Sequence, residues 1–186
     1  MDNQERVVLT DGDGHDLLHD DGTVRTMEKM EAHRRGLGHR AVSVFVFNSR
    51  GDLLLQRRAP GKYHSPGRWT NTCCTHCRQG EIPADTAVRR LREEMGLQCR
   101  LREVFSFPYH AGVGNGMIEN EFDHVFVGQC DDRPAPDPAE ISDWKWMAPG
   151  AIQEGLATSP EQYTYWLRCC FDEVLSCLAG DAGGSS

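Results

Sequence analysis

The sequence has no run that is long and apolar enough to span a bilayer, and its first residues lack the basic-then-apolar order of a signal peptide. It also lacks an excess of basic residues, because 28 acidic side chains against 20 basic ones give a formal net charge of −8. General affinity for nucleic acid needs a basic face, whereas a local basic cluster is enough to hold a small anion. We therefore expect a cytoplasmic protein with neither a membrane nor a nucleic acid as its partner.

The paired cysteine spacing of a zinc ribbon is absent, although the chain has eight cysteines. Cys74 and Cys77 form one C-x-x-C motif, and no second one follows. In a reducing compartment, free thiols are expected rather than disulfides. The stretch RWTNTCCTHCRQGE, residues 68–81, leaves three alternatives open: a zinc or redox module on Cys73, Cys74 and Cys77, a reactive thiol, or a buried turn.

The remaining patterns predict one domain over residues 1–178, followed by a disordered tail, AGDAGGSS, at 179–186. Strands are predicted at 5–10, 41–47, 52–58, 101–107, 121–129 and 143–147. Helices are predicted at 84–96 and from about 160 to 178, and RPAPDPAE, 133–140, is a proline-rich loop. This order predicts a compact α+β or α/β sandwich, in which the strand at 41–47 is covered on both faces.

The helix at 84–96 has the clearest signals. Asp85 is positioned to cap it and Gly96 to end it. Arg90 and Glu94 lie one turn apart, so a basic and an acidic group can face the same neighbour. The apolar stripe of this helix is formed by Ala87, Val88, Leu91 and Met95.

Three histidines and two glutamates form a candidate metal site. In the segment ENE, an extended backbone places Glu119 and Glu121 on the same face. Two adjacent carboxylates repel each other, and one pKa rises unless a cation lies between them. With His33, His39 and His76, they offer nitrogen and oxygen donors that suit a divalent first-row ion of high coordination number. The alternative is a pair of solvated carboxylates.

The predicted helix also carries a motif of diphosphate chemistry. Residues 75–97 resemble the Nudix box, G-x5-E-x7-R-E-U-x-E-E-x-G-U, where U is aliphatic. Thr75 replaces the first glycine, and Arg90 replaces the glutamate after the first arginine. In Nudix hydrolases that glutamate helps to bind the magnesium that activates water. A Nudix pyrophosphohydrolase therefore stays an alternative that Arg90 disfavours, while Glu94 can still hold one Mg²⁺ against a diphosphate.

Further segments, spread from about residue 5 to 170, resemble type I isopentenyl-diphosphate isomerase, a Nudix-fold enzyme. These segments are MEKMEAH, GLGHRAVSVFVFN, LLLQRRAPGKY, WTNTCCTH, RRLREEMG, FPYHA, ENEFDHVF and SPEQYTYW. Cys77 stands where the family usually has proline, and the loop between His33 and His39 is one residue shorter than in some relatives. The resemblance implies a Nudix fold with mixed β-sheets flanked by helices.

The resemblance also implies a reaction, the interconversion of isopentenyl diphosphate and dimethylallyl diphosphate in isoprenoid biosynthesis. One proton is added and another removed, through a tertiary carbocation. Cys74 matches the catalytic thiol, Glu121 the catalytic carboxylate and Tyr109 its hydrogen-bonding partner, while Trp166 matches an aromatic residue that faces the cation. We expect Glu121, backed by Tyr109, to give the proton in the forward direction with Cys74 opposite, although the sequence does not settle which group acts first.

Ligands and cofactors follow from the same resemblance. The family's metal ligands match His33, His39, His76, Glu119 and Glu121, for Mn²⁺, Mg²⁺ or Zn²⁺. Glu94 and the Cys74 carbonyl match the ligands of a Mg²⁺ that bridges to the diphosphate. The cations that bind the diphosphate match Lys29, Arg58, Lys62 and Arg90. We expect a small prenyl diphosphate as the partner, and a monomer, with a weak homodimer as the alternative.

Overall fold

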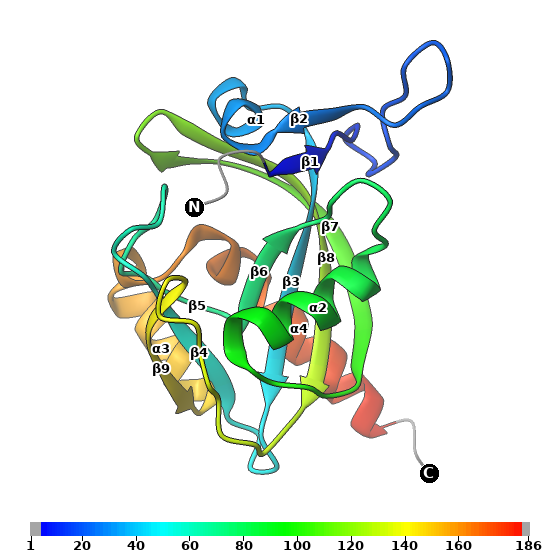
Figure 1. Cartoon of the computed structure of the whole chain (residues 1–186). Helices are drawn as coiled ribbons and strands as arrows, with labels where there is room; N and C mark the ends of the chain where they lie inside the picture. The colour runs from blue at the N-terminus through cyan, green and yellow to red at the C-terminus, as the bar shows by residue number, and fades with distance from the viewer. Residues whose placement is uncertain (1–4, 184–186) are drawn as a thin grey trace.

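The computed structural model describes residues 5–183 (Figure 1). The strands are β1 (Arg6–Val8), β2 (Thr26–Glu28), β3 (His39–Phe47), β4 (Leu53–Arg58), β5 (Trp69–Thr70), β6 (Cys73–His76), β7 (Leu101–Gly114), β8 (Met117–Gln129) and β9 (Ile141–Met147). The helices are α1 (Lys29–Arg35), α2 (Pro83–Met95), α3 (Pro149–Thr158) and α4 (Tyr165–Gly183), with a short 3₁₀ turn, η1 (Pro160–Gln162).

Strand β3 is the centre of the main sheet. It pairs in parallel with β8 and antiparallel with both β4 and β6. Strand β8 continues the sheet to β7, and β4 continues it to β5 and β9. The prediction that β3 is covered on both faces is confirmed, because Val42 and Val44 belong to one hydrophobic cluster and Phe45 and Phe47 to another. A strand without a solvent face is apolar along nearly its whole length.

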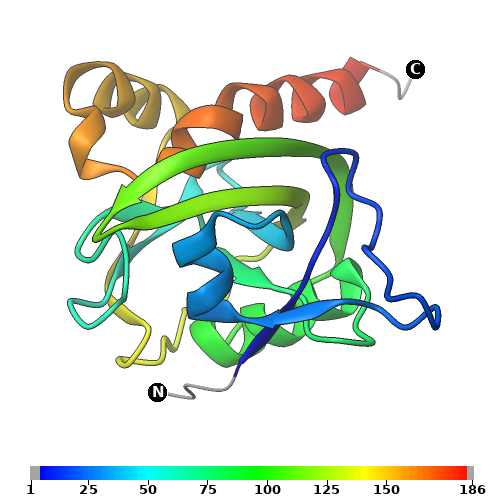
Figure 2. The same ribbon diagram turned by 90° about the horizontal axis from the view of Figure 1, so that it is seen from above.

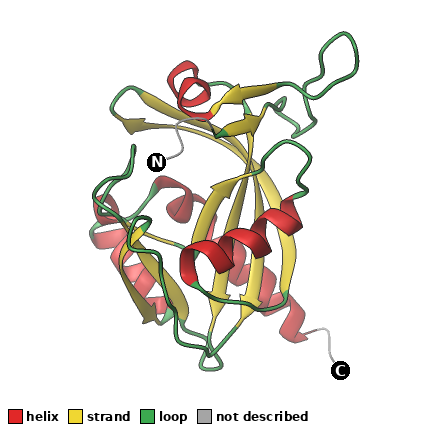
Figure 3. Ribbon diagram, in the orientation of Figure 1, coloured by secondary structure: helices red, strands yellow, loops and turns green. Residues whose placement is uncertain are grey.

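Two helices cover opposite faces of this sheet, which confirms the predicted sandwich of mixed sheet and helices (Figures 2 and 3). Helix α2 packs through Leu91 and Met95 against the face that carries Val42 and Val44. Helix α4 packs through Leu167 and Phe171 against the face that carries Phe45. In Figure 2 the β7–β8 hairpin passes between these two helices.

A small second sheet, β1 with β2, lies with α1 at one end of the main sheet (Figure 1). A cluster of Val7, Leu9 and Ala32 joins β1 to α1. The helix begins after Glu28, whose carboxylate accepts hydrogen bonds from two backbone N–H groups of the first turn, and ends at Gly36 in the left-handed conformation. Because seven residues are too few to show a helical period, the sequence did not predict α1.

Helix α2 confirms the predicted helix and corrects two of its details. It starts at Pro83, so Asp85 lies inside the first turn and is not the N-cap. Proline suits this position because the first helical N–H has no partner within the helix. Val88 is 47% exposed and therefore lies outside the apolar stripe. Gly96 ends the helix as predicted, with φ +66°.

The short elements β2, β5, β6 and α3 were not predicted, and the predicted strands at 101–107 and 121–129 are longer in the structure. Strand β7 runs on to Gly114 and β8 starts at Met117, so the two form a hairpin. Asn115 and Gly116, at its tip, both have positive φ, as a tight turn between right-twisted strands requires. This asparagine–glycine pair is the sequence signal of the hairpin.

Helix α4 starts later and ends later than predicted. The segment from Pro160 first forms the turn η1, and the α-helix begins only at Tyr165. It then extends to Gly183 and so overlaps the first residues of the tail at 179–186, whose disorder stays a prediction. Residues 184–186 lie outside the described residues. Neither α4 nor another helix in the described part of the chain combines the length and the apolar character needed to cross a membrane.

Replacement of Gly96 by alanine is expected to destabilise the protein by about 1–3 kcal/mol. Its φ is +66°, and an added Cβ would lie 2.8 Å from the carbonyl oxygen of Ala135. Gly51→Ala is the matched control, because Gly51 has φ +81° but nothing within 4 Å of the added Cβ. Urea unfolding should show the larger loss for Gly96→Ala, and equal losses would contradict a role for the Ala135 contact.

Candidate metal and active site

The candidate site forms on one face of the main sheet, where β3 lies between β6 and β8. The register pairs His39 with Glu121, and Ser43 with Cys74. Because side chains alternate along a strand, His39 and Ser43 point to the same face, and their cross-strand partners share it. Strand β3 thus brings together side chains of β6 and β8 that lie far apart in the sequence, His76 and Glu121 for example being 45 residues apart.

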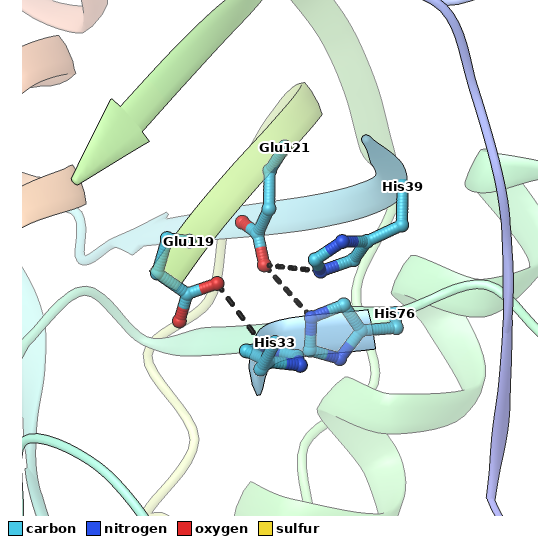
Figure 4. A group of neighbouring side chains, drawn as sticks. All are labelled: His33, His39, His76, Glu119 and Glu121. Atoms are coloured by element: carbon cyan, nitrogen blue, oxygen red, sulfur yellow. Dashed lines mark hydrogen bonds and ion pairs between the residues drawn. The ribbon is translucent and has the colours of Figure 1, made fainter. Parts of the chain in front are cut away.

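The five residues predicted as ligands of one metal ion lie together in a buried cluster (Figure 4). A nitrogen or oxygen of each lies within 4.8 Å of those of all the others. Helix α1, β3 and β6 each supply one histidine, and β8 supplies both glutamates. The cluster consists of His33, His39, His76, Glu119 and Glu121.

Two of the histidines direct Nε2 to the centre of this cluster. The Nδ1 atoms of His33 and His39 lie 2.7 and 2.8 Å from the backbone carbonyl oxygens of Lys29 and Leu37. A carbonyl oxygen only accepts, so each Nδ1 donates, and each imidazole in its neutral form then has its lone pair on Nε2. Within residues 5–183 neither Nε2 has a hydrogen-bond partner, and carboxylate oxygens lie 3.2 and 3.4 Å away. A divalent cation between these facing lone pairs would satisfy them, so the donor set fits a metal.

Both carboxyl groups of the cluster are ionised. Burial by itself raises the pKa of Glu119, but the His33 and His64 imidazoles outweigh it and hold this pKa well below its usual range. Burial and the charge of Glu119 raise the pKa of Glu121, but the neighbouring His39 and His76 imidazoles lower it by more, so this pKa lies below its usual range. The surrounding imidazoles therefore offset the rise in pKa that two adjacent carboxylates predict.

The thiol of Cys74 is held by two polar side chains. Its Sγ lies 3.1 Å from Ser43 Oγ and 3.1 Å from Asn71 Oδ1. The Ser43 hydroxyl donates a 2.7 Å hydrogen bond to Oδ2 of the buried Asp123. Burial, and then the charge of Asp123, raises the pKa of the Cys74 thiol well above its usual range. At neutral pH this thiol therefore carries its proton.

The neighbouring cysteines belong to the hydrophobic core. Cys73 and Cys77 are fully buried in the cluster that packs against α2, on the face opposite Cys74. Burial raises the pKa of Cys77 to about 11, so it is an unreactive thiol that fills space where the family usually has proline. The zinc or redox module considered for Cys73, Cys74 and Cys77 does not form, because Cys74 lies on the opposite face of the sheet from the other two.

Cys74 and Glu121 line one cavity of about 690 Å³. Tyr109, also in its wall, donates a short hydrogen bond to Glu121 Oε2. Trp166 is 2% exposed and donates from Nε1 to Asn71 Oδ1 over 3.2 Å. The side chains predicted to move protons and to face a cation therefore surround the same space.

The four predicted diphosphate-binding cations also line this cavity, and they are Lys29, Arg58, Lys62 and Arg90. Lys29 forms a 2.6 Å ion pair with Glu5, and Lys62 forms a short one with Glu140. Arg90 pairs with Glu94, one turn further along α2. The sequence predicted that Arg90 and Glu94 face the same neighbour, and the structure shows them facing each other.

Several residues of the site were missed from the sequence. Asp123 continues the alternation of Glu119 and Glu121 along β8, a signal that was available. Glu5, Glu140 and His64 follow no such pattern, because their positions beside the cavity depend on how separate loops and strand ends approach it.

Comparison with known proteins gives three consistent similarities. A model of the NUDIX domain matches residues 37–167. The chain is 48% identical to Isopentenyl-diphosphate Delta-isomerase 2 of Aromatoleum aromaticum, over 98% of this chain and 93% of that protein. It is 49% identical to Isopentenyl-diphosphate Delta-isomerase of Cereibacter sphaeroides, over 80% of this chain and 85% of that protein. The crystal structure of DR0079 from Deinococcus radiodurans has the same fold, with a TM-score of 0.66 at 23% identity, over 93% of this chain and 99% of that one.

A divalent cation is expected to raise the melting temperature of this protein, because it relieves the facing lone pairs of the histidine–glutamate cluster. At a free concentration 100 times Kd, the stabilisation is about 2.7 kcal/mol. Thermal unfolding in EDTA is compared with unfolding in Mn²⁺, Mg²⁺ and Zn²⁺. His39→Ala should remove most of the shift, whereas Cys74→Ala should keep it. If no ion shifts the transition, the cluster is not a metal site.

The ion pair of Glu5 with Lys29 is expected to make stability depend on pH in the acid range. Burial raises the pKa of Glu5, but Lys29 outweighs it and the pKa falls from 4.5 to about 2. Since the folded-state pKa is the lower one, the stabilisation is complete above the unfolded value and is lost as pH falls from 4.5 towards 2.

Urea unfolding of the wild type and of Glu5→Gln, from neutral pH down to about pH 2, measures how much the ion pair contributes to stability. The wild type should be more stable by up to about 3 kcal/mol near neutral pH, with the difference vanishing at the acid limit. A difference that stays constant over this range would contradict the ion pair as its source.

Proposed function

The chain belongs to the isopentenyl-diphosphate Delta-isomerase family of NUDIX-domain proteins, and we propose that it interconverts isopentenyl diphosphate and dimethylallyl diphosphate in isoprenoid biosynthesis. One observation carries this proposal: a single cavity is lined by the Cys74 thiol, the Glu121 carboxylate, Trp166 and five cationic side chains, Arg78 among them. The thiol and carboxylate suit the proton transfers, and the cations suit a diphosphate.

The reaction moves a double bond by adding a proton to one carbon and removing a proton two carbons away. Cys74 on β6 and Glu121 on β8 come from the two strands that flank β3, and both face the cavity. A short alkenyl chain between them meets one proton-handling group from each strand. An unactivated alkene is a poor base, so the transfer needs this close placement and the exclusion of water.

The protonation states of these two groups define which can give a proton. Cys74 keeps its proton, and Glu121 is ionised with the Tyr109 hydroxyl donating to it. These states suit the direction in which Cys74 gives a proton and Glu121 accepts one. The reverse transfer has Glu121, backed by Tyr109, as the proton donor and Cys74 as the acceptor. The sequence favours this second assignment for the forward reaction.

Trp166 is the residue that we assign to the carbocation. Its ring is buried in the cavity wall, and an aromatic face over a desolvated cation contributes about 2 kcal/mol. The ring offers no lone pair that would capture the cation. The nearby Tyr109 hydroxyl is engaged with Glu121, which keeps this possible nucleophile occupied.

We assign two metal sites to the reaction. The histidine–glutamate cluster would hold Mn²⁺, Mg²⁺ or Zn²⁺, and Glu94 with the Cys74 carbonyl would hold Mg²⁺. When bound, these ions supply positive charge that fixes Glu121 and offsets the diphosphate. Lys29, Lys62 and Arg90 would exchange their present carboxylate partners for phosphate oxygens, so those partners hold the cations in place before substrate binds.

The alternative within the fold is a Nudix pyrophosphohydrolase. Arg90 stands where the Nudix box has a glutamate that binds magnesium, and its ion pair with Glu94 supplies charge compensation instead of a metal ligand. We therefore favour the isomerase. We further propose that the protein acts in the cytoplasm as a monomer on a small prenyl diphosphate.

Incubation with isopentenyl diphosphate and Mg²⁺ tests the proposal, with the allylic product and inorganic phosphate both measured. We expect isomerisation without phosphate release. Cys74→Ala and Glu121→Gln should each lower kcat by about 10²–10⁴-fold, because each removes a proton-transfer group. Cys169→Ala, which removes an exposed thiol, is the matched control and should keep full activity. Phosphate release without allylic product would identify a hydrolase instead.

A further inference from the structure

We propose that His64 is a positioning residue for Glu119, holding one oxygen of this carboxylate so that the other is presented to the metal. This inference rests on the metal site proposed above. His64 lies between β4 and β5 and is 3% exposed. It is not one of the five residues whose donor atoms all lie within 4.8 Å of one another, so it lies outside the ligand set.

The two oxygens of Glu119 have different neighbours. Oε1 lies 2.7 Å from Nε2 of His64, whereas Oε2 lies 3.2 Å from Nε2 of His33, inside the ligand cluster. Neither ring nitrogen of His64 meets hydrogen-bond geometry within residues 5–183, so this is an ion-pair contact and not an aligned hydrogen bond. A carboxylate oxygen only accepts, so a neutral imidazole makes this contact favourably with its proton on Nε2. One oxygen is thereby committed to His64, and rotation of the carboxylate away from the cluster would break this contact.

The two oxygens of the second glutamate of the cluster, Glu121, also have different neighbours. Oε1 of Glu121 faces His76 and His39 at 2.7 and 3.4 Å, and Oε2 accepts the hydrogen bond of Tyr109. Each glutamate therefore has one oxygen on the cluster side and one outer partner. Outer partners of this kind orient metal ligands, and their loss weakens metal binding. Tyr109 has a role in the proposed proton transfer, whereas the carboxylate that His64 contacts, Glu119, has none.

The structure around His64 fixes the position of its ring. Arg58 donates a 3.1 Å hydrogen bond from Nη2 to the His64 backbone carbonyl. The imidazole packs edge-on against Tyr63 and Trp166, with centroids 4.3 and 5.7 Å away. The next residue, Ser65, has φ +45°, a conformation that non-glycine residues keep only where their surroundings impose it. The hydrogen bond from Arg58 and the backbone conformation of Ser65 therefore both hold the backbone at His64.

Three substitutions separate donation from packing. Glutamine reaches about as far as Nε2 of histidine and carries N–H donors there, so His64→Gln can still hold Glu119. Asparagine is polar but shorter, and His64→Asn leaves Oε1 without its partner. Leucine fills similar space and has no donor. His110→Leu, at an exposed histidine of β7, is the matched control.

The test is titration of the metal-free proteins with Mn²⁺, followed by calorimetry and by the electron paramagnetic resonance of free Mn²⁺. We expect His64→Leu and His64→Asn to bind Mn²⁺ about 10–100-fold more weakly than the wild type, and His64→Gln to lose less than tenfold. Melting temperatures in EDTA show whether each variant is folded. If His64→Leu does not fold, the comparison of His64→Gln with His64→Asn decides.

Two outcomes would overturn the inference. Wild-type Mn²⁺ affinity in His64→Asn would show that Glu119 needs no outer partner, and equal weakening in the glutamine and asparagine variants would show that donation is not the cause. His39→Ala, titrated in parallel, separates these outcomes from failure of the metal site itself. If His39→Ala also binds Mn²⁺ as the wild type does, the cluster is not the binding site and the proposed cofactor assignment fails with it.

Discussion

The pairing of β3 with β6 on one side and β8 on the other is the constraint on which the rest of the site depends. Its register sets His39 opposite Glu121 and Ser43 opposite Cys74, on one face of the sheet. A slip of one residue in either ladder would turn the thiol or both glutamates to the other face, where α2 packs. The hydrophobic residues that alternate with them, among them Val42 and Val44, oppose such a slip because they fill that packed face.

The same sheet face serves two purposes along its length. Near the end of β3 that carries His39, polar side chains meet around the cavity, and further along Phe45 and Phe47 pack against α4. Helix α1 and the β1–β2 sheet close the polar end and supply His33 and Lys29. The site is therefore assembled from one face of the sheet and a covering segment, which together bury the histidine–glutamate cluster.

Charge in this acidic protein is balanced locally. Five cationic side chains line the cavity. Three of them, Lys29, Lys62 and Arg90, pair with Glu5, Glu140 and Glu94 from three separate parts of the chain. The pKa values of the buried glutamates in the histidine cluster are lowered by the imidazoles around them. Buried charges need such partners, because desolvation without them costs several kcal/mol for each ion. Local pairs of this kind allow a protein of net negative charge to line one cavity with basic side chains.

The sequence by itself determined the long apolar strand β3, helix α2 with its terminal Gly96, and the sandwich class, because these features follow from periods that many residues repeat. It also indicated the thiol, the histidines and the paired glutamates, because these residues lie in short contiguous motifs. It did not determine where α1 begins, that Asp85 is not a cap, or that α4 extends to Gly183.

Only the tertiary structure decided that Ser43 and Asp123 adjoin the thiol, that Cys77 is a core residue, and that His64 reaches Glu119. Each of these contacts joins segments that are distant in the chain. Which segments meet depends on strand register and on the packing of loops over the sheet, and neither is encoded in a local period.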